Sequence, residues 1–513
     1  MVFSSAVFLL LFFPLTVLLY YLIPGRAAKN IFLLAASLVF YAWGEPTYIF
    51  LMILSMAVNW LFGLLIDSPS QSPHPARRKA LLVADLVANL LVLGFFKYEG
   101  FVAENVNALF GSQVIPGLDL PLPIGISFYT LQALSYVIDV YRREVPAQRN
   151  ILYLGMYIAM FPQLVAGPIV RYSTIQDQVL NRKENMADFC SGLRLFCVGL
   201  GKKVLLANVV AILATKMLSL GGEGIGAVGA WAGLIAYTFQ IYFDFAGYSD
   251  MAIGLGKMFG FKYLRNFNYP YLSKSATEFW RRWHISLSSF FRDYVYIPLG
   301  GSRVSTRRWV LNIAVVWGLT GLWHGAAWNF ILWGLFYGVL LVCEKLFLLK
   351  LVGRLPALFQ HVYGILCFMF GWLIFWIEDL GQMGHYLMAM FGFYGPTGTS
   401  TFWELTTWEY VPVFAVCTIA STPIVPWIRF KLTAWFNDCR ATGFLQTDLP
   451  YHKNLDTDAL CTFEPPAAPC SVRKKVVYTA LSWAIDVALI VLLLASVSAV
   501  VSGSFNPFIY FRF

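Results

Sequence analysis

Charged residues are scarce in this chain, and their scarcity excludes an ordinary soluble protein. Asp, Glu, Lys and Arg together make up 12% of the 513 residues, against roughly 25% in soluble globular domains. Hydrophobic residues account for 59% and aromatic residues for 17%. We therefore expect a polytopic membrane protein of the all-α class.

Signatures of three other chemistries are missing or misplaced. The eight cysteines include no CxxC pair, so no metal site is expected. No GxSxG motif occurs, which argues against a classical acyl-serine enzyme. A GxGxxG match at 224–229 follows a helical-looking run and not a strand, so no bound dinucleotide is expected.

Long apolar runs are the dominant pattern. One crossing needs about 20 apolar residues, and full or partial runs of this kind occur at 5–22, 49–66, 80–96, 231–243, 331–349, 362–376 and 476–501. Because several are short or interrupted by Gly and Pro, we expect roughly 10 to 13 transmembrane or re-entrant helices. The first run lacks a basic region and a cleavage site, and is expected to remain as a span.

The net charge of +10 arises from short basic loops and predicts topology, not nucleic-acid binding. These loops contain Arg26, Lys29, Arg77, Arg78, Lys79, Arg142, Arg143, Lys202, Lys203, Arg303, Arg307, Arg308, Arg473, Lys474 and Lys475. The positive-inside rule places them in the cytoplasm, which puts the N-terminus and the aromatic C-terminal tail, 502–513, outside. No nucleic acid is expected as a partner.

The chain is expected to form a single membrane domain, 1–513, with one polar insertion. Residues 437–475 are rich in Asp, Pro and Thr and carry Cys439, Cys461 and Cys470. Such a composition is typical of a surface loop between two spans. The sequence predicts no function for it.

His324 is an ionisable residue inside the hydrophobic stretch 309–342, in the run GLWHGAAW at 321–328. Burying a polar side chain at membrane depth costs roughly 2–3 kcal/mol, so an intramembrane His is a candidate functional residue. The alternative is a packing residue held by its neighbours Trp323 and Trp328.

A second candidate, His284, lies in the polar cluster TEFWRRWHISLS at 277–288. If this segment is one helix, Glu278 lies within ion-pair reach of the two arginines that follow, and Trp280 and His284 share one face. We predict that Trp283 and Arg282 support the site by packing and charge balance.

Two acids, Asp244 and Asp250, end the apolar run QIYFDFAGYSD at 240–250. The commoner role for such a residue is to pair with an arginine and shape a helix end. Support of the site by Asp244 stays open as the alternative.

The two histidines, each in Trp-rich apolar sequence, predict a polar site inside the membrane whose chemistry is acyl transfer. A neutral imidazole can take the proton from an attacking hydroxyl. Without an acyl-serine motif, we expect direct transfer or relay through another hydroxyl.

Five motifs, in order along nearly the whole chain, resemble the bacterial branch of the membrane-bound O-acyltransferases. They are LPIGISFY at 122–129, FPQLVAGP at 161–168, YFDFAGYSDMA at 242–252, the stretch 279–301 and GLWHG at 321–325. The resemblance is strongest to the alginate O-acetyltransferase membrane subunit-like branch, because YIPLGGSR at 296–303 continues the FWRRWHISLS core as that branch does. The D-alanyl transferase branch shares the core, and a D-alanyl or other acyl transferase of the same family stays open as the alternative.

The resemblance implies helices around a central tunnel in the bacterial inner membrane, with His324 as the invariant catalytic His and His284 as the second. It implies acetyl-CoA as the cytoplasmic acyl donor, with no bound cofactor. The implied acceptor is an extracytoplasmic polysaccharide of the alginate type, cellulose or peptidoglycan, reached with partner acetyltransferase proteins. Arg303, Arg307 and Arg308 could contact the CoA phosphates, although the positive-inside pattern explains them too.

The tail contains Tyr510, which related systems suggest as an acyl relay. Its alternative role is interfacial anchoring in contact with membrane lipid. Two other function classes stay open: a transporter, which would also show broken helices and buried charge, and a scaffold for polysaccharide export, which would not depend on His324.

Overall fold

The computed structural model describes residues 1–68, 74–118, 120–221, 225–393, 398–436 and 472–503, and these are helical with no strand. The helices of the first half are η1 (Phe8–Phe12), α1 (Phe13–Leu22), α2 (Arg26–Ala42), α3 (Ile49–Asp67), α4 (Pro75–Phe110), α5 (Ile126–Arg142), α6 (Ile151–Ala159), α7 (Phe161–Leu164), α8 (Tyr172–Asn181), α9 (Met186–Gly201), η3 (Lys202–Ala207), α10 (Asn208–Ser219) and α11 (Gly226–Met258). The second half contains η4 (Pro270–Leu272), α12 (Ala276–Arg282), α13 (Ile285–Phe291), η5 (Arg292–Tyr296), α14 (Thr306–His324), α15 (Trp328–Cys343), η6 (Glu344–Leu348), α16 (Leu349–Val352), α17 (Ala357–Trp376), α18 (Leu380–Met390), α19 (Gly398–Ala420), α20 (Ile424–Phe436) and α21 (Val472–Val501).

The predicted all-α polytopic class is confirmed. In the part of the chain that is described, five helices are long and apolar enough to cross a membrane: α3, α4, the continuous Met186–Ser219, α17 and α21. A bent pair in α19 and α20 makes a sixth if counted as one span. The expectation of 10 to 13 also counted shorter and more polar helices, such as Phe8–Leu22 and α11, as crossings or re-entrant segments.

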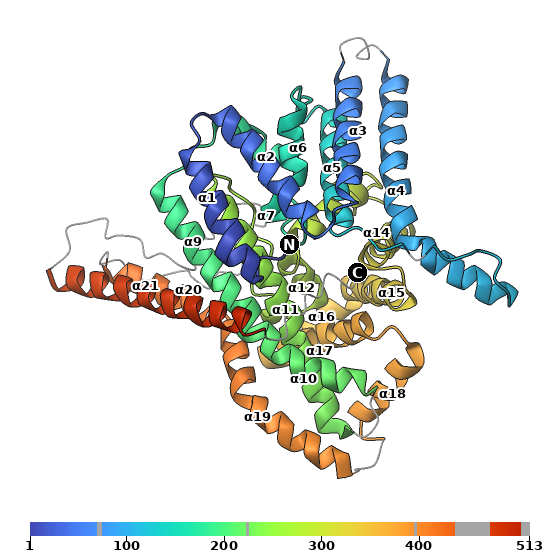
Figure 1. Ribbon diagram of the computed structural model, residues 1–513. Coiled ribbons are helices and arrows are strands. Elements are labelled where there is room, and N and C mark those ends of the chain that lie inside the picture. Colours follow the sequence, from blue (N-terminus) through green and yellow to red (C-terminus); the bar gives the residue numbers. More distant parts are fainter. Residues whose placement is uncertain (69–73, 119, 222–224, 394–397, 437–471, 504–513) are drawn as a thin grey trace.

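Helix α11 runs through the centre of the molecule, beside α9 (Figure 1). The two helices touch backbone to backbone along a seam of glycines. A Cβ added to Gly192 would lie 2.5 Å from the carbonyl oxygen of Gly254, and one added to Gly199 would lie 2.6 Å from that of Gly247. Because the pairs run in opposite directions along the chain, the helices are antiparallel. Small residues at helix contacts are how membrane proteins bring backbones close.

Two ion pairs join α11 to η3 and correct the prediction for its acids. Asp244 accepts from Lys203 at 2.6 Å, with both side chains 2% exposed, and Asp250 accepts from Lys202 at 2.7 Å. The partners are therefore lysines and not arginines. Both acids lie within α11 and not at a helix end, because the helix continues to Met258. Paired charges are tolerated in a low-dielectric core where single ones are not.

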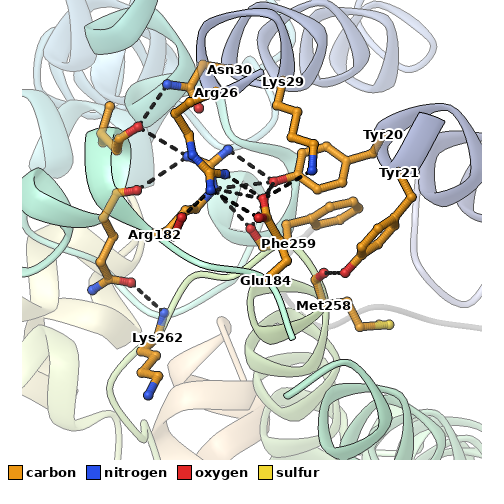
Figure 2. Close-up of polar contacts among 12 residues, drawn as sticks. Tyr20, Tyr21, Arg26, Lys29, Asn30, Arg182, Glu184, Met258, Phe259 and Lys262 are labelled. Carbon is orange, nitrogen blue, oxygen red and sulfur yellow. Dashed lines mark hydrogen bonds and ion pairs between the residues drawn. The ribbon is translucent and has the colours of Figure 1, made fainter. Parts of the chain in front are cut away.

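A second polar cluster ties the first two helices to the α8–α9 linker (Figure 2). Arg26 donates to Glu184 at 2.5 Å, and the Tyr20 hydroxyl donates to the same carboxylate at 2.5 Å. The guanidinium of Arg182 donates to the carbonyl of Phe259, after the end of α11, at 3.0 Å. Burial alone would raise the pKa of Glu184, but the hydrogen bonds from Arg26 and Tyr20 outweigh it and lower the pKa to about 2.

Candidate active site

His324 is the last residue of α14, and the close packing of α14 on α15 brings it into the core. A Cβ on Gly334 would lie 2.5 Å from the carbonyl oxygen of Trp317, so the two helices meet without side chains between them. In Figure 1 they lie side by side. His324 is only 5% exposed. The end of one helix therefore presents an imidazole inside the protein.

Aromatic rings enclose the His324 imidazole edge to face. Its ring centroid lies 4.9 Å from Trp323, 4.9 Å from Trp333 and 5.2 Å from Phe375 on α17. Among the described residues, its buried Nδ1 has no hydrogen-bond partner. A buried polar atom without a partner is uncommon in native proteins and marks a candidate ligand contact.

A pocket opens beside His324. Its walls come from four segments far apart in the sequence: α4, the LPIGISF stretch that leads into the first turn of α5, the residue after α7, and the end of α14. The lining residues are Lys97, Leu122, Pro123, Ile124, Gly125, Ile126, Ser127, Phe128, Val165, Trp323 and His324. Three of the motifs found in the sequence, LPIGISFY, FPQLVAGP and GLWHG, therefore meet at one cavity.

The segment around His284 is not one continuous helix, so the predicted stacking of Trp280 on His284 along one face is wrong. Helix α12 ends at Arg282, and α13 begins at Ile285. His284 stands between them with φ 45° and ψ 54°, a left-handed conformation that is rare for a non-glycine residue. Strained backbone of this kind persists where surrounding structure enforces it, often at functional sites.

The loop residue Asn266 enforces this turn. Its carbonyl oxygen accepts from the backbone N–H of Ile285 at 2.9 Å, and its side-chain oxygen accepts from the backbone N–H of Ser286 at 3.1 Å and from the Ser286 hydroxyl at 2.9 Å. Because a backbone N–H can only donate, the atom of Asn266 that faces it is the oxygen. The orientation of the amide is thereby settled.

The same oxygen selects the tautomer of His284. The imidazole Nδ1 lies 3.3 Å from Asn266 Oδ1, and an oxygen acceptor requires a proton on that nitrogen. In the neutral ring, Nε2 then carries the free lone pair. Nε2 is buried and has no hydrogen-bond partner among the described residues, so it is available to a substrate proton.

Both imidazoles pack on the indole of Trp323. The His284 centroid lies 6.1 Å from it and the His324 centroid 4.9 Å from it. The two imidazole centroids are therefore at most about 11 Å apart, so both rings can face one site. His284 also packs edge to face on Phe245 of α11, at 4.6 Å.

The carboxylate of Glu344 fixes the start of α12. Glu344 is 1% exposed and accepts from the backbone N–H groups of Ala276 and Thr277, each at 2.8 Å, and from the Tyr363 hydroxyl at 2.8 Å. A carboxylate at a helix N-terminus satisfies free N–H groups and opposes the helix dipole. The segment that leads into His284 is held at its first turn in this way.

The other predicted site residues have partners of their own. Trp283 is buried, 4.7 Å from Trp372, and Arg282 forms the predicted ion pair with Glu278 at 2.8 Å. Asp244 is held by Lys203, as described above. Tyr510 lies outside the described residues.

The basic group Arg303, Arg307 and Arg308 is exposed at the opposite end of α14 from His324. At 1.5 Å rise per residue, the 16 residues from Arg308 to His324 span about 24 Å. The length of α14 thus separates the arginines from His324 by nearly the thickness of a bilayer core.

Sequence reasoning missed Lys97, Asn266 and Glu344. Lys97 directly follows the apolar run 80–96, and Glu344 lies inside the run 331–349. Both carried the signal that identified His324, an ionisable residue in apolar sequence. Nothing local marks Asn266, whose partner lies 20 positions away. In the described part of the chain, no group of three or more His, Cys, Asp or Glu is placed to hold a metal ion.

Comparison with known proteins gives consistent matches. The model of the membrane-bound O-acyltransferase family matches residues 142–383, which include His284 and His324. A probable alginate O-acetylase, AlgI, of Azotobacter vinelandii is 39% identical over 100% of both chains. A peptidoglycan O-acetyltransferase of Helicobacter pylori is 33% identical over 77% of this chain and 80% of its own. A teichoic acid D-alanyltransferase of Bacillus subtilis is 30% identical over 50% of this chain and 73% of its own.

Proposed function

The chain belongs to the membrane-bound O-acyltransferase family, and we propose that it takes acetyl from acetyl-CoA on the cytoplasmic side of the bacterial inner membrane. The acetyl group then passes to hydroxyls of an extracytoplasmic polysaccharide. Alginate is the proposed acceptor, because relatives that match over full length are named as probable alginate O-acetylases. The peptidoglycan O-acetyltransferase, which matches over less of the chain, supports a second polymer class.

The observation that carries the proposal is His324 at the wall of a pocket, with a buried ring nitrogen that has no hydrogen-bond partner in the described part of the chain. As the oxygen of the acceptor hydroxyl bonds to the thioester carbonyl carbon of acetyl-CoA, the His324 imidazole takes the proton of that hydroxyl. The carbon–sulfur bond then breaks, and the CoA sulfur leaves with that proton. A positioned base of this kind contributes typically 10²–10⁴ in rate.

His284 supplies a second imidazole to the same aromatic cavity. Its Asn266 contact leaves Nε2 free to accept a hydrogen bond from the attacking hydroxyl or to orient the donor. We expect His284 to contribute less to the rate than His324, because His324 itself lines the pocket.

The exposed arginines at the start of α14 are proposed to bind the CoA phosphates. Their distance of about 24 Å from His324 suits a long donor that enters from the cytoplasm with its thioester leading. Replacing Arg303, Arg307 and Arg308 together by Gln is expected to raise KM for acetyl-CoA and leave kcat nearly unchanged. A fall in kcat without a change in KM would contradict this role.

Partner acetyltransferase proteins outside the membrane are proposed to complete the transfer. Tyr510 is the proposed carrier, because the positive-inside rule places the tail outside and a phenol ester is more reactive than an alkyl ester. Direct transfer from acetyl-CoA to the polymer is the alternative within the same family chemistry.

The test of the function is acetyl transfer by a His324→Ala variant. The purified full-length protein receives acetyl-CoA labelled in the acetyl group, and release of CoA and labelling of polymer are both measured. His324→Ala is expected to lose at least about 100-fold in rate, while His74→Ala, at an exposed position before α4, keeps wild-type activity. Normal turnover by folded His324→Ala would refute the proposal and favour a scaffold.

The teichoic acid D-alanyltransferase match supports a different acyl group as the second candidate. It covers half of this chain, whereas the O-acetylase matches cover all of it. Transfer from a D-alanyl thioester, with none from acetyl-CoA, would favour that reading. Movement of polymer or lipid without thioester cleavage would indicate a transporter.

A further inference from the structure

The end of α14 is capped by side chains from another helix. The last carbonyl groups of an α-helix have no partner within the helix. Here the Tyr98 hydroxyl donates to the carbonyl of Leu322, and the Lys97 ammonium donates to the carbonyls of Trp323 and, at 3.2 Å, His324. Two consecutive residues of α4 thus satisfy three consecutive carbonyls that end in the His324 carbonyl.

Lys97 is an unusual residue to find at this position. It is 9% exposed, and its ammonium also lies 3.4 Å from the hydroxyl of Ser127, which lines the pocket from the first turn of α5. An ammonium in a largely apolar helix is costly unless its donors are satisfied. The C-terminal end of a helix carries partial negative charge, which favours a cation at this position.

The backbone determines where the His324 ring stands. Among the described residues, Nδ1 of His324 has no hydrogen-bond partner, and the ring contacts in the structure are aromatic edges. Aromatic packing restricts the orientation of the imidazole ring. It does not fix the position of the C-terminal end of α14, which carries the ring. The cap from α4 acts on the peptide groups on both sides of the His324 Cα.

We propose that Lys97, assisted by Tyr98, is a positioning residue that holds His324 at the wall of the pocket. The role rests on the proposed function in one respect, that His324 is the base. Lys97 itself takes no proton from the substrate in this scheme. It fixes the last turn of α14 to α4 and to the first turn of α5, so the imidazole and the pocket keep one geometry.

The test combines kinetics with a chemical probe of His324. Lys97→Met keeps the length and apolar stem but removes the ammonium. In full-length detergent-solubilised protein, kcat for release of CoA from acetyl-CoA is expected to fall about 100-fold, the cost of a misplacement near 1 Å, with KM changed less than about threefold. Carbethoxylation of His324 by diethyl pyrocarbonate, followed by peptide mass mapping, is expected to quicken by about tenfold or more as the helix end loosens.

Conservative variants and a matched control separate positioning from general stability. Lys97→Arg, which keeps the charge and the donors, is expected to restore most of kcat, and Tyr98→Phe to give a smaller loss. Lys257→Met removes another buried ammonium, which donates to Ser191 on α9 at 3.3 Å, and is expected to leave kcat per folded molecule unchanged.

Three outcomes overturn the proposal: wild-type kcat and labelling in folded Lys97→Met, an equal loss in Lys257→Met, or no recovery in Lys97→Arg. If Lys97→Met does not accumulate, Lys97→Gln and Tyr98→Phe carry the same measurements. The labelling arm does not depend on turnover. Absence of acetyl transfer by the wild type would therefore refute the proposed function alone, while His324 labelling would still decide the role of Lys97.

Discussion

Replacing Asn266 by Leu is expected to remove the side-chain contact that orients the imidazole of His284. The side-chain oxygen of Asn266 accepts from the Ser286 backbone N–H and from the Ser286 hydroxyl, and it faces His284 Nδ1. Leu has a similar volume but no acceptor. The Ser286 hydroxyl can rotate to another acceptor, whereas the Ser286 backbone N–H and the His284 Nδ1–H are left without an acceptor.

Each stranded buried donor costs about 1–3 kcal/mol, so the Leu variant is expected to lose about 2–6 kcal/mol of stability. The imidazole also loses the contact that keeps its proton on Nδ1, and the population with a free Nε2 lone pair falls. Loss of such an orienting contact typically reduces activity by about 10- to 100-fold. The expected change is in kcat, because no contact of Asn266 with the donor phosphates is proposed.

The assay is release of CoA from labelled acetyl-CoA by detergent-solubilised protein, with thermal unfolding measured on the same samples. Asn266→Asp keeps an oxygen at the same position and is expected to retain most of kcat. Asn268→Leu makes the same change two residues away, in the same loop, and is expected to behave as wild type. A folded Asn266→Leu protein with normal kcat would refute the tautomer argument.

Four further outcomes are expected. His284→Ala should lose less kcat than His324→Ala, and an equal or larger loss would reverse the two roles. The pKa of Glu184 in the folded protein is depressed to about 2 from an ordinary 4.5. Its stabilising contribution is therefore complete above pH 4.5 and is lost as the pH falls toward 2. Glu184→Gln should accordingly flatten the fall of Tm between pH 4.5 and 2. Tyr510→Phe, which keeps the ring, should abolish polymer acetylation if the tail is a relay and preserve it if the tail is an anchor. A reporter fused after Phe513 should be active only as an exported enzyme, and cytoplasmic activity would contradict the predicted topology.

The fold class and the family could be predicted from the sequence because both depend on local patterns. Apolar runs of the right length define helices whatever packs around them. The intrahelical pair Glu278 and Arg282 was predicted for the same reason, since residues four apart on a helix are neighbours. The resemblance to the membrane-bound O-acyltransferases is confirmed by the matches to the family and its members.

What the sequence could not supply were the contacts between segments. The break of the helix at His284 depends on Asn266, in a different loop, and periodicity alone favours an unbroken helix through 277–288. The pairing of Asp244 with Lys203 instead of an arginine depends on how α9 leads into η3 and packs on α11. The catalytic roles of His284 and His324 stay predictions, since proximity does not measure turnover.

The glycine seam between α9 and α11 has a consequence for the insertion of the protein into the membrane during synthesis. Helix α9 is synthesised and inserted before α11, yet Lys203 acquires Asp244 as its counter-ion only when α11 arrives. Until then the nascent chain lacks that counter-ion, and a charged side chain in lipid carries an energetic penalty. Side chains larger than hydrogen at Gly192 or Gly199 would prolong that stage by keeping the backbones apart. Such variants would then be lost mainly because cellular quality control degrades partly inserted chains, and less because catalytic activity is reduced.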